Sequence, residues 1–296
     1  MLFRIVSYST FFLSIIAVTA QSSSAQSIKH WRTTAAGVPI QVITVDLNDP
    51  SIKVTAQMPK FGAGYSEPFG QMVRRTQPTV ALTGTFFCTQ SKLPVGDIVI
   101  DGQLEHFGGM GTALCITDNN EVEFVKTARY KHQDWSKFDF VMSCGPRLIT
   151  NGKVYVQPKV EGFRDKNMLR PNSRLAVVLT KGKKLIFVTT RKPVILSKLA
   201  KAMRAIGVVN AMNLDAGSSL GLHYKGKTII KPGRWLTNLI LVYRDRNRYF
   251  DMKEGLAPAP AMTASRETPV VTTRTSSEGG VTHITLPMPA FSNPNP

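Results

Sequence analysis

The chain has 296 residues, 43% of them hydrophobic, which is enough to bury a substantial core. The formal net charge of +18 at pH 7 favours anionic partners such as a phosphorylated glycan, an anionic polysaccharide or a membrane surface. We find no recognition helix, zinc finger or aromatic RNA-binding motif, which argues against nucleic acid as the partner.

Residues 1–25 have the features of a secretory signal peptide. Arg4 gives the start a positive charge, and the apolar run at 11–18 is too short for a comfortable membrane span. Small residues at 18–20 and 23–25 offer cleavage sites. The sequence therefore predicts export to the periplasm or the extracellular space, with an uncleaved membrane anchor as the alternative.

Residues 27–250 are expected to form one domain or two closely packed halves. Alternating or apolar runs predict strands at 39–47, 52–56 and 80–87. Between the last two, Ser66 and Pro68 predict a helix start, and Pro78 should end that helix. The next strand, at 97–102, enters a hairpin turn.

Further hairpins are expected around 112–125, 148–156, 175–189 and 220–230. The strongest of them contains Asn151-Gly152, a pair that suits a type I′ turn. Residues 197–206 predict the clearest helix, with Ser197 as its cap, and 239–243 predict a last strand. Dominant hairpins and two main helices favour an α+β fold with a mixed, largely antiparallel sheet.

Residues 251–296 are rich in Pro, Thr, Ser and Ala and show no sustained hydrophobic period. This composition predicts a disordered tail. The tail has three basic and four acidic residues, a contribution of 3 − 4 = −1, so the basic excess belongs to the predicted domain.

The three cysteines differ in their surroundings. Cys115 lies in an apolar run and is expected to be a buried small residue. Cys88 and Cys144 both lie beside Gly-containing turns and are the candidate pair for a disulfide in an oxidising compartment. A catalytic thiol is the alternative, although no partner residue singles one out.

Asp215 stands between an apolar approach and a Gly-Ser turn. The run at 205–211 indicates a buried strand approach, and Gly217 and Ser218 bring conformational freedom and hydrogen-bond donors to the turn. A strand end that delivers an acid into such a turn suits chemistry on an anionic substrate. The alternative is an Asx-type turn, in which the carboxylate bonds only to its own backbone.

Five blocks, taken in order over about residues 40–245, resemble the phosphodiester glycosidase family, which includes bacterial exopolysaccharide-associated proteins. They are 67–87 with its Thr-Gly-Thr-Phe-Phe strand, 94–102, 144–153 with Cys-Gly-Pro-Arg, 170–178 led by Arg174, and 213–238 with Asn-Leu-Asp-Ala-Gly-Ser-Ser. Any one block is weak, but their order and spacing are fairly specific.

The chain departs from the family pattern at three positions. Thr83 stands where the family has Asn, Thr85 where it has Gly, and Ala216 replaces a Gly in a turn that is one Gly short. A Thr hydroxyl does not reproduce the paired geometry of an amide, and Ala resists a positive φ angle. These departures put substrate choice and activity in question.

The resemblance implies hydrolysis of a sugar-1-phosphodiester in a phosphorylated glycan or exopolysaccharide. Asp215 is the first candidate for nucleophile or base, and Asp97 is the second, with a strand-end structural role as its alternative. Planar guanidinium groups suit phosphate. The implied substrate- and phosphate-binding residues are Thr83, Gly84, Arg147, Arg174, Asn213, Gly217, Ser218 and Arg234.

The alternative is that these residues only form turns or lie solvated on the surface. The five histidines show no metal-ligand spacing, so we predict neither a metal nor a cofactor. The rival to an enzyme is a non-catalytic, envelope-associated module that binds anionic polysaccharide through its charge, with Thr83 and Ala216 marking a lost active site.

Overall fold

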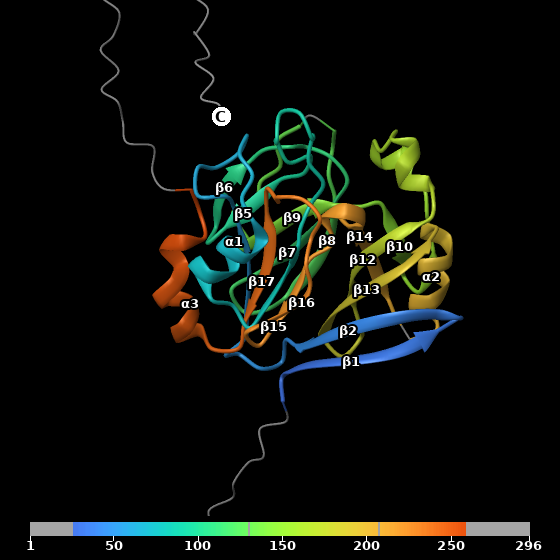
Figure 1. The fold of residues 1–296 in the computed structure, drawn as a ribbon, viewed down its shortest axis with the longest axis horizontal. Helices are drawn as coiled ribbons and strands as arrows, with labels where there is room; N and C mark the ends of the chain where they lie inside the picture. Colours follow the sequence, from blue (N-terminus) through green and yellow to red (C-terminus); the bar gives the residue numbers. More distant parts are fainter. Residues whose placement is uncertain (1–25, 130, 207, 259–296) are drawn as a thin grey trace, which may run out of the picture. The chain divides into compact units, whose positions relative to one another are not determined.

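The computed structural model describes residues 26–129, 131–206 and 208–258, which belong to one structural unit (Figure 1). The predicted signal peptide and most of the predicted tail lie outside the described residues. The described part contains three sheets in which every strand pairing is antiparallel, together with helices, so the predicted α+β class is confirmed.

The largest sheet has seven strands, and its central strands are buried on both faces. Along β12, Leu175 and Val177 face one core while Ala176 and Val178 face another, as the two-residue period of a strand requires. In spatial order the strands are β1 (Ile28–Ala35), β2 (Val38–Asp46), β13 (Lys184–Val194), β12 (Asn172–Leu179), β14 (Asn210–Leu214), β10 (Arg147–Thr150) and β11 (Lys153–Val154).

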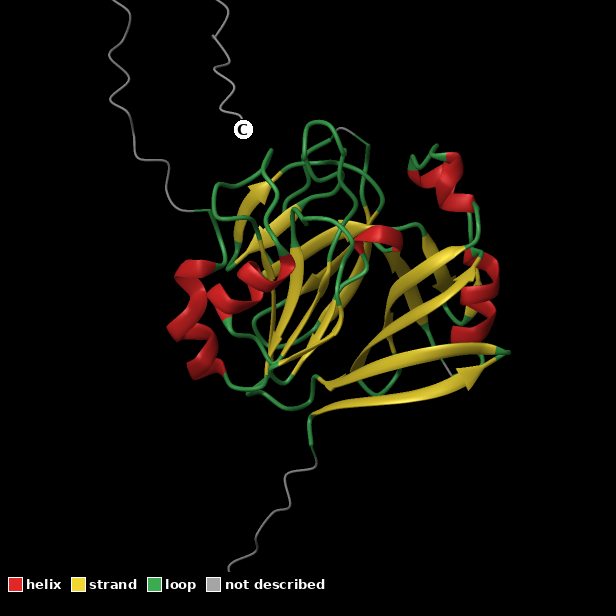
Figure 2. Ribbon diagram, in the orientation of Figure 1, coloured by secondary structure: helices red, strands yellow, loops and turns green. Residues whose placement is uncertain are grey.

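Two five-stranded sheets complete the fold (Figure 2). One has the order β16 (Lys227–Ile230), β15 (Leu222–Tyr224), β4 (Val80–Thr83), β17 (Leu239–Tyr243) and β3 (Lys53–Gln57). The other has the order β6 (Gln103–His106), β5 (Ile98–Ile100), β9 (Phe140–Cys144), β7 (Thr112–Ile116) and β8 (Val122–Lys126).

One hydrophobic core joins all three sheets. Val177 from the large sheet, Leu82 and Leu241 from the second, and Leu114 and Met142 from the third belong to one buried cluster. Burial of apolar area is the dominant favourable term in folding. This shared core therefore fixes the sheets against one another, and the ends of the internal strands β4 and β14 carry the site described below.

Three α-helices and four short 3₁₀ segments are described. The α-helices are α1 (Phe69–Thr76), α2 (Leu196–Arg204) and α3 (Arg246–Met252), and the 3₁₀ segments are η1 (Pro158–Glu161), η2 (Lys166–Leu169), η3 (Gly217–Ser219) and η4 (Lys253–Gly255). Leu199 and Met203 of α2 pack on the outer face of the seven-stranded sheet. Within the described residues, none of these helices is long and apolar enough to cross a bilayer.

Two predicted local features differ in outcome. The Asn151-Gly152 hairpin is confirmed, with positive φ angles of 49° and 75° at the two turn residues. The predicted cap Ser197 lies inside α2, whose N-cap is Ile195, and α1 begins after Pro68 with no side-chain cap from Ser66. In both helices, packing of the apolar face rather than capping sets the start.

The folded region continues past the predicted boundary at residue 250. Helix α3 extends to Met252 because Tyr249 packs edge-on against Tyr243 and donates a hydrogen bond to Asp101 (2.9 Å). Leu256 is fully buried, and its carbonyl accepts a hydrogen bond from the backbone of Met58 (2.8 Å). Composition does not reveal this docking, since the contacts come from distant segments.

The end of β4 is held where the sheets meet. The carboxamide of Asn238 accepts a hydrogen bond from the backbone N–H of Thr85 (2.6 Å) and donates to the Thr85 carbonyl (3.2 Å). Gly84 passes so close to this amide that a Cβ there would lie 2.2 Å from Asn238 Oδ1 and 3.0 Å from Met142 Cε. Gly84 is therefore needed for close packing.

Replacing this glycine tests the close packing. We expect Gly84→Ala to lower the free energy of unfolding by about 1–3 kcal/mol, because the added methyl group must displace a buried amide. Gly182→Ala is the matched control, since a Cβ at Gly182 meets nothing within 4 Å. Denaturant unfolding of both variants checks this. Equal stability of Gly84→Ala and wild type would contradict the packing argument.

Candidate active site

Asp215 follows directly on β14 and lies where two sheets meet. Its backbone N–H donates to the carbonyl of Gly84 at the end of β4 (3.0 Å). One carboxylate oxygen accepts the N–H of Ala216 (2.8 Å). The side chain is 7% exposed and lines a cavity. The strand end and the bond across the sheets together place one carboxyl on the cavity wall.

The turn after Asp215 requires no left-handed conformation at Ala216. Ala216 has φ −154°, outside the left-handed region, and Gly217 alone of the two has a positive φ, 63°. The positive φ that an alanine would resist therefore does not occur at Ala216. The glycine that the turn requires is present, one position later.

Thr83 fastens this turn to β4. Its hydroxyl donates to the carbonyl of Ser219 (2.6 Å) and accepts the N–H of Gly221 (2.9 Å). Both hydrogen-bonding functions of the hydroxyl are thus used, and Thr83 is 1% exposed. Neither Thr83 nor Gly84 lines the cavity, so the structure assigns both of them to holding its floor in place.

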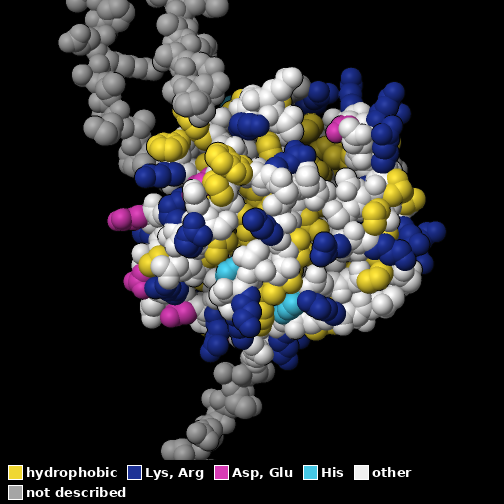
Figure 3. Space-filling model, in the orientation of Figure 1, with side chains coloured by type: hydrophobic (Ala, Val, Ile, Leu, Met, Phe, Trp, Pro, Cys, Tyr) yellow, Lys and Arg dark blue, Asp and Glu magenta, His cyan; other side chains and the backbone are white. Residues whose placement is uncertain are grey.

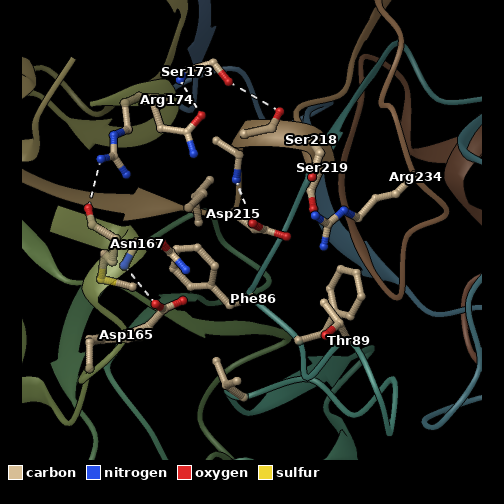
Figure 4. Close-up of a pocket in the computed structure, with 18 of the residues that line it drawn as sticks. Phe86, Thr89, Asp165, Asn167, Ser173, Arg174, Asp215, Ser218, Ser219 and Arg234 are labelled. Carbon is tan, nitrogen blue, oxygen red and sulfur yellow. Dashed lines mark hydrogen bonds between the residues drawn. The ribbon is translucent and has the colours of Figure 1, made fainter. Parts of the chain in front are cut away.

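The cavity has a volume of about 530 Å³ (Figure 4). Its polar lining includes Asp215, Ser219 and Arg234 on one side and Asp165 and Asn167 on another. The other lining residues are Phe86, Phe87, Thr89, Val95, Met110, Gly162, Phe163, Arg164, Met168, Asn172, Ser173, Arg174, Leu214, Ala216, Gly217 and Ser218.

Burial shifts the ionisation of Asp215 strongly. Loss of solvation raises the pKa of the carboxyl from 3.8 to about 7. The Ser219 side chain, the Ala216 N–H and the positive charge of Arg234 each lower that pKa but only partly offset the effect. A carboxyl of this kind changes charge near neutral pH, as a general base or nucleophile in a cleft does.

Arg234 differs from the other predicted phosphate ligands. Figure 4 shows its guanidinium directed towards the carboxyl of Asp215. The N–H of Gly233 donates to the carbonyl of Ser218 (2.8 Å), which fixes the chain next to Arg234. The Arg234 guanidinium has no hydrogen-bond or salt-bridge partner among the described residues. Its donors are therefore available to an anionic ligand.

Arg174 lines the cavity, but its guanidinium is engaged by the backbone. Nε donates to the carbonyl of Val194 (3.0 Å), and Nη2 donates to those of Met168 (2.9 Å) and Arg170 (2.6 Å). Burial lowers its pKa to about 10, so it remains charged at pH 7. Arg174 holds the η2 segment and adds positive charge to the cavity wall.

Three other predicted residues lie away from the cavity lining. Arg147 donates to the carbonyl of Phe124 (3.0 Å). Asn213 is buried, and its amide donates to the carbonyls of Gly145 (3.3 Å) and Leu214 (2.9 Å). The implied phosphate- or substrate-binding role of Arg147 and Asn213 is corrected to a structural one.

Asp97 is the third. It is fully buried and accepts hydrogen bonds from the backbone of Gly108 (2.9 Å) and Gly109 (2.7 Å) and from the indole of Trp135 (3.0 Å). These three donors hold the carboxylate in place outside the cavity. The prediction of Asp97 as a second catalytic carboxylate is therefore corrected, and the strand-end structural alternative fits the geometry.

The predicted disulfide is wrong. Cys88, Cys115 and Cys144 are all free thiols, with Cys88 exposed and the other two buried. Cys144 belongs to β9 inside the shared core, whereas Cys88 lies in the segment after β4. Within the described residues, no group of three or more His, Cys, Asp or Glu is placed to hold a metal ion.

Sequence reasoning missed the far wall of the cavity. Asp165 brings a second carboxylate, which is exposed and accepts the N–H of Asn167 (2.8 Å). Ser173 donates to the carbonyl of Gly217 (3.3 Å) and so joins this wall to the Asp215 turn. The sequence signals only an irregular segment between Gly162 and Pro171 here, with nothing to indicate a site.

Comparison with solved structures identifies similar folds. The chain matches a hypothetical protein from Synechocystis with a TM-score of 0.61 and 17% identity, covering 73% of this chain and 61% of that one, less than two thirds of its length. It also matches the catalytic domain of zebrafish N-acetylglucosamine-1-phosphodiester alpha-N-acetylglucosaminidase, auto-inhibited by its pro-peptide. That match has a TM-score of 0.62 and 20% identity, covering 75% of this chain and 85% of that one.

At these identities the likeness shows the fold. No curated protein sequence matches the chain. The sequence profile of the family described as phosphodiester glycosidase matches residues 76–243, which is more than half of the chain and spans β4, the Asp215 turn and Arg234. The chain therefore belongs to the phosphodiester glycosidase family.

Proposed function

We propose that the protein is an exported hydrolase that cleaves a sugar-1-phosphodiester in a phosphorylated glycan or exopolysaccharide. One observation carries this proposal. The buried carboxyl of Asp215, with a pKa of about 7, shares a cavity with the uncommitted guanidinium of Arg234. A carboxylate serves attack at an anomeric carbon, and a guanidinium serves a phosphate.

In the proposed reaction, the bond between the anomeric carbon and the phosphate oxygen breaks. Ionised Asp215 either takes a proton from the water that attacks that carbon, or attacks the carbon itself and forms a glycosyl ester, which water then hydrolyses to release the sugar and the carboxyl group. The bonding electron pair leaves with the phosphate, which departs as a monoester while Arg234 balances its charge. The leaving phosphate is already a weak base, so it needs little protonation by a general acid. One buried carboxylate can therefore suffice for the reaction.

Two observations favour an enzyme over the non-catalytic binding module. Ala216 needs no positive φ, and the Thr83 hydroxyl makes two hydrogen bonds that hold the turn. The departures from the family pattern thus leave the turn intact around Asp215. Affinity for anionic polysaccharide through the +18 net charge would add to an enzymatic function rather than replace it.

The proposals of export and of an anionic glycan partner rest on the amino-acid sequence. Export is supported by the N-terminal charge, the short apolar run and the small-residue cleavage sites within 1–25. The glycan partner is supported by the basic excess; Lys and Arg side chains are spread over the face shown in Figure 3. Membrane-surface association would use the same charge.

Removing the carboxylate tests the role of Asp215. We expect Asp215→Asn to lower kcat/KM on a chromogenic sugar phosphodiester by roughly 10²- to 10⁴-fold, the usual contribution of a positioned base. Asp134→Asn, an exposed carboxylate outside the cavity lining, should leave the rate unchanged. Equal rates for Asp215→Asn and wild type would remove Asp215 from the mechanism.

The ionisation of Asp215 also predicts a pH-dependent stability. The carboxyl has a higher pKa in the folded chain than its ordinary value of 3.8, so the folded state favours the protonated form. The free energy of unfolding is therefore unaffected below about pH 4, decreases as the pH rises and reaches its full decrease above about pH 7.

We therefore expect Asp215→Asn to raise the Tm relative to wild type at pH 8 and to have little effect at pH 4. Asp134→Asn is the control, and its effect on the Tm at pH 8 should have the opposite sign, because hydrogen bonds with Ser136 lower the pKa of Asp134. Thermal unfolding of the three proteins across this pH range measures the difference. A pH-independent difference between Asp215→Asn and wild type would show that the carboxyl is not shifted upwards.

A further inference from the structure

A second hollow adjoins the Asp215 cavity, and we call it the Trp235 hollow. It is lined by Ser66, Phe87, Thr89, Lys92, Arg234 and Trp235. Three of these residues, Phe87, Thr89 and Arg234, also line the Asp215 cavity. The two hollows are therefore neighbours that share a wall, and the Arg234 guanidinium stands at their junction.

The walls of the Trp235 hollow are held by backbone hydrogen bonds. On one side, Glu67 and Leu236 exchange two such bonds (2.8 and 3.0 Å), which fixes the preceding residues Ser66 and Trp235. On the other side, Phe87 pairs with Pro94, and the N–H of Cys88 donates to the carbonyl of Leu93 (3.0 Å). The hollow is thus preformed, which reduces the entropy lost when a ligand binds.

Trp235 presents a large apolar ring at this position. Its side chain is 61% exposed, and the rings of Phe61 (70% exposed) and Tyr65 (56% exposed) form a contact pair earlier in the chain, just before Ser66. Large aromatic side chains normally bury much of their area, and an exposed one beside a hollow offers an apolar face to a ligand. A flat indole beside a polar hollow fits the C–H face of a sugar ring.

The charges of the Trp235 hollow select an anion. Its lining contains Lys92 and Arg234 and no carboxylate. Lys92 donates one hydrogen bond to the carbonyl of Thr89, which leaves further N–H donors on its ammonium group. With Arg234 assigned to the phosphate at the junction, Lys92 remains for a second negative group.

We propose that the Trp235 hollow is a subsite for an anionic sugar on the leaving-group side of the phosphodiester. This proposal rests on the proposed function for its orientation. The sugar ring packs on Trp235, its negative substituent pairs with Lys92, and the phosphate lies on Arg234 between the two hollows. The substrate class is then an interior phosphodiester of an anionic glycan chain rather than a diester of a small alcohol.

Binding of leaving-group fragments tests the subsite without requiring turnover. The probes are methyl phosphate and the 4-phosphate of methyl glucuronide, which adds an anionic sugar ring to the same phosphate. We expect calorimetry to give the wild type about tenfold tighter binding of the sugar phosphate, the order of magnitude of one aromatic contact. Trp235→Ala and Lys92→Gln should each remove most of that preference and leave the Kd of methyl phosphate unchanged.

Two further variants keep the test specific. Trp235→Phe retains an aromatic face and should keep most of the preference. Trp31→Ala should keep all of it, because Trp31 is an exposed tryptophan (42%) on β1, outside both hollows. Thermal unfolding confirms that each variant is folded, which is expected because Trp235 is largely solvent-exposed.

An unchanged preference in Trp235→Ala, or no preference in the wild type, would overturn the subsite. A membrane surface is the competing occupant, tested by cosedimentation with vesicles of phosphatidylglycerol and phosphatidylcholine. Vesicle binding that is lost in Trp235→Ala, with no sugar phosphate preference in the wild type, would assign the rings to a bilayer and also overturn the proposal. Because these readouts are affinities, a lack of turnover would count against the proposed function and not against the subsite.

Discussion

The close meeting of β4 and β14 is the constraint on which the site depends. The N–H of Asp215 bonds to the carbonyl of Gly84, and the amide of Asn238 clamps Thr85 immediately beyond it. A side chain at Gly84 would collide with that amide, so the Asn238 clamp forms only next to a glycine. Because buried backbone groups must be paired, this arrangement leaves few alternatives for the course of the chain. The Asp215 turn begins from a fixed point.

The electrostatic character of the cavity follows from which side chains already have partners. Arg174 gives its donors to backbone carbonyls, and Thr83 uses its hydroxyl to hold the turn. Arg234 lies at the rim, beside a backbone bond that positions it, with its donors open. The cavity therefore combines a fixed positive wall with one guanidinium that can follow a ligand. On the same side of the cavity stands the Asp215 carboxyl, whose pKa burial raises to about 7.

The sequence predicts local features better than distant contacts. The apolar strand ending at Asp215 and the Asn151-Gly152 turn are readable because neighbouring residues determine them. The roles of the arginines are not readable, since the tertiary fold brings the carbonyl of Phe124 to Arg147, whereas it brings no hydrogen-bond partner among the described residues to the guanidinium of Arg234. The same reason explains the misassigned Asp97, whose three donors come from distant loops. Asp165 and Trp235 follow no sequence period at all, so only the fold reveals that they line adjoining hollows.

In the proposed reaction the bond at the anomeric carbon breaks, and not a bond to phosphorus. Hydrolysis of a sugar-1-phosphodiester in ¹⁸O-labelled water distinguishes the two, because the phosphate monoester keeps its oxygens once released. Attack at carbon by water or by Asp215 predicts a phosphate monoester free of label, with ¹⁸O in the sugar hydroxyl. Label in the phosphate monoester would mean attack at phosphorus and would contradict the roles assigned to Asp215 and Arg234.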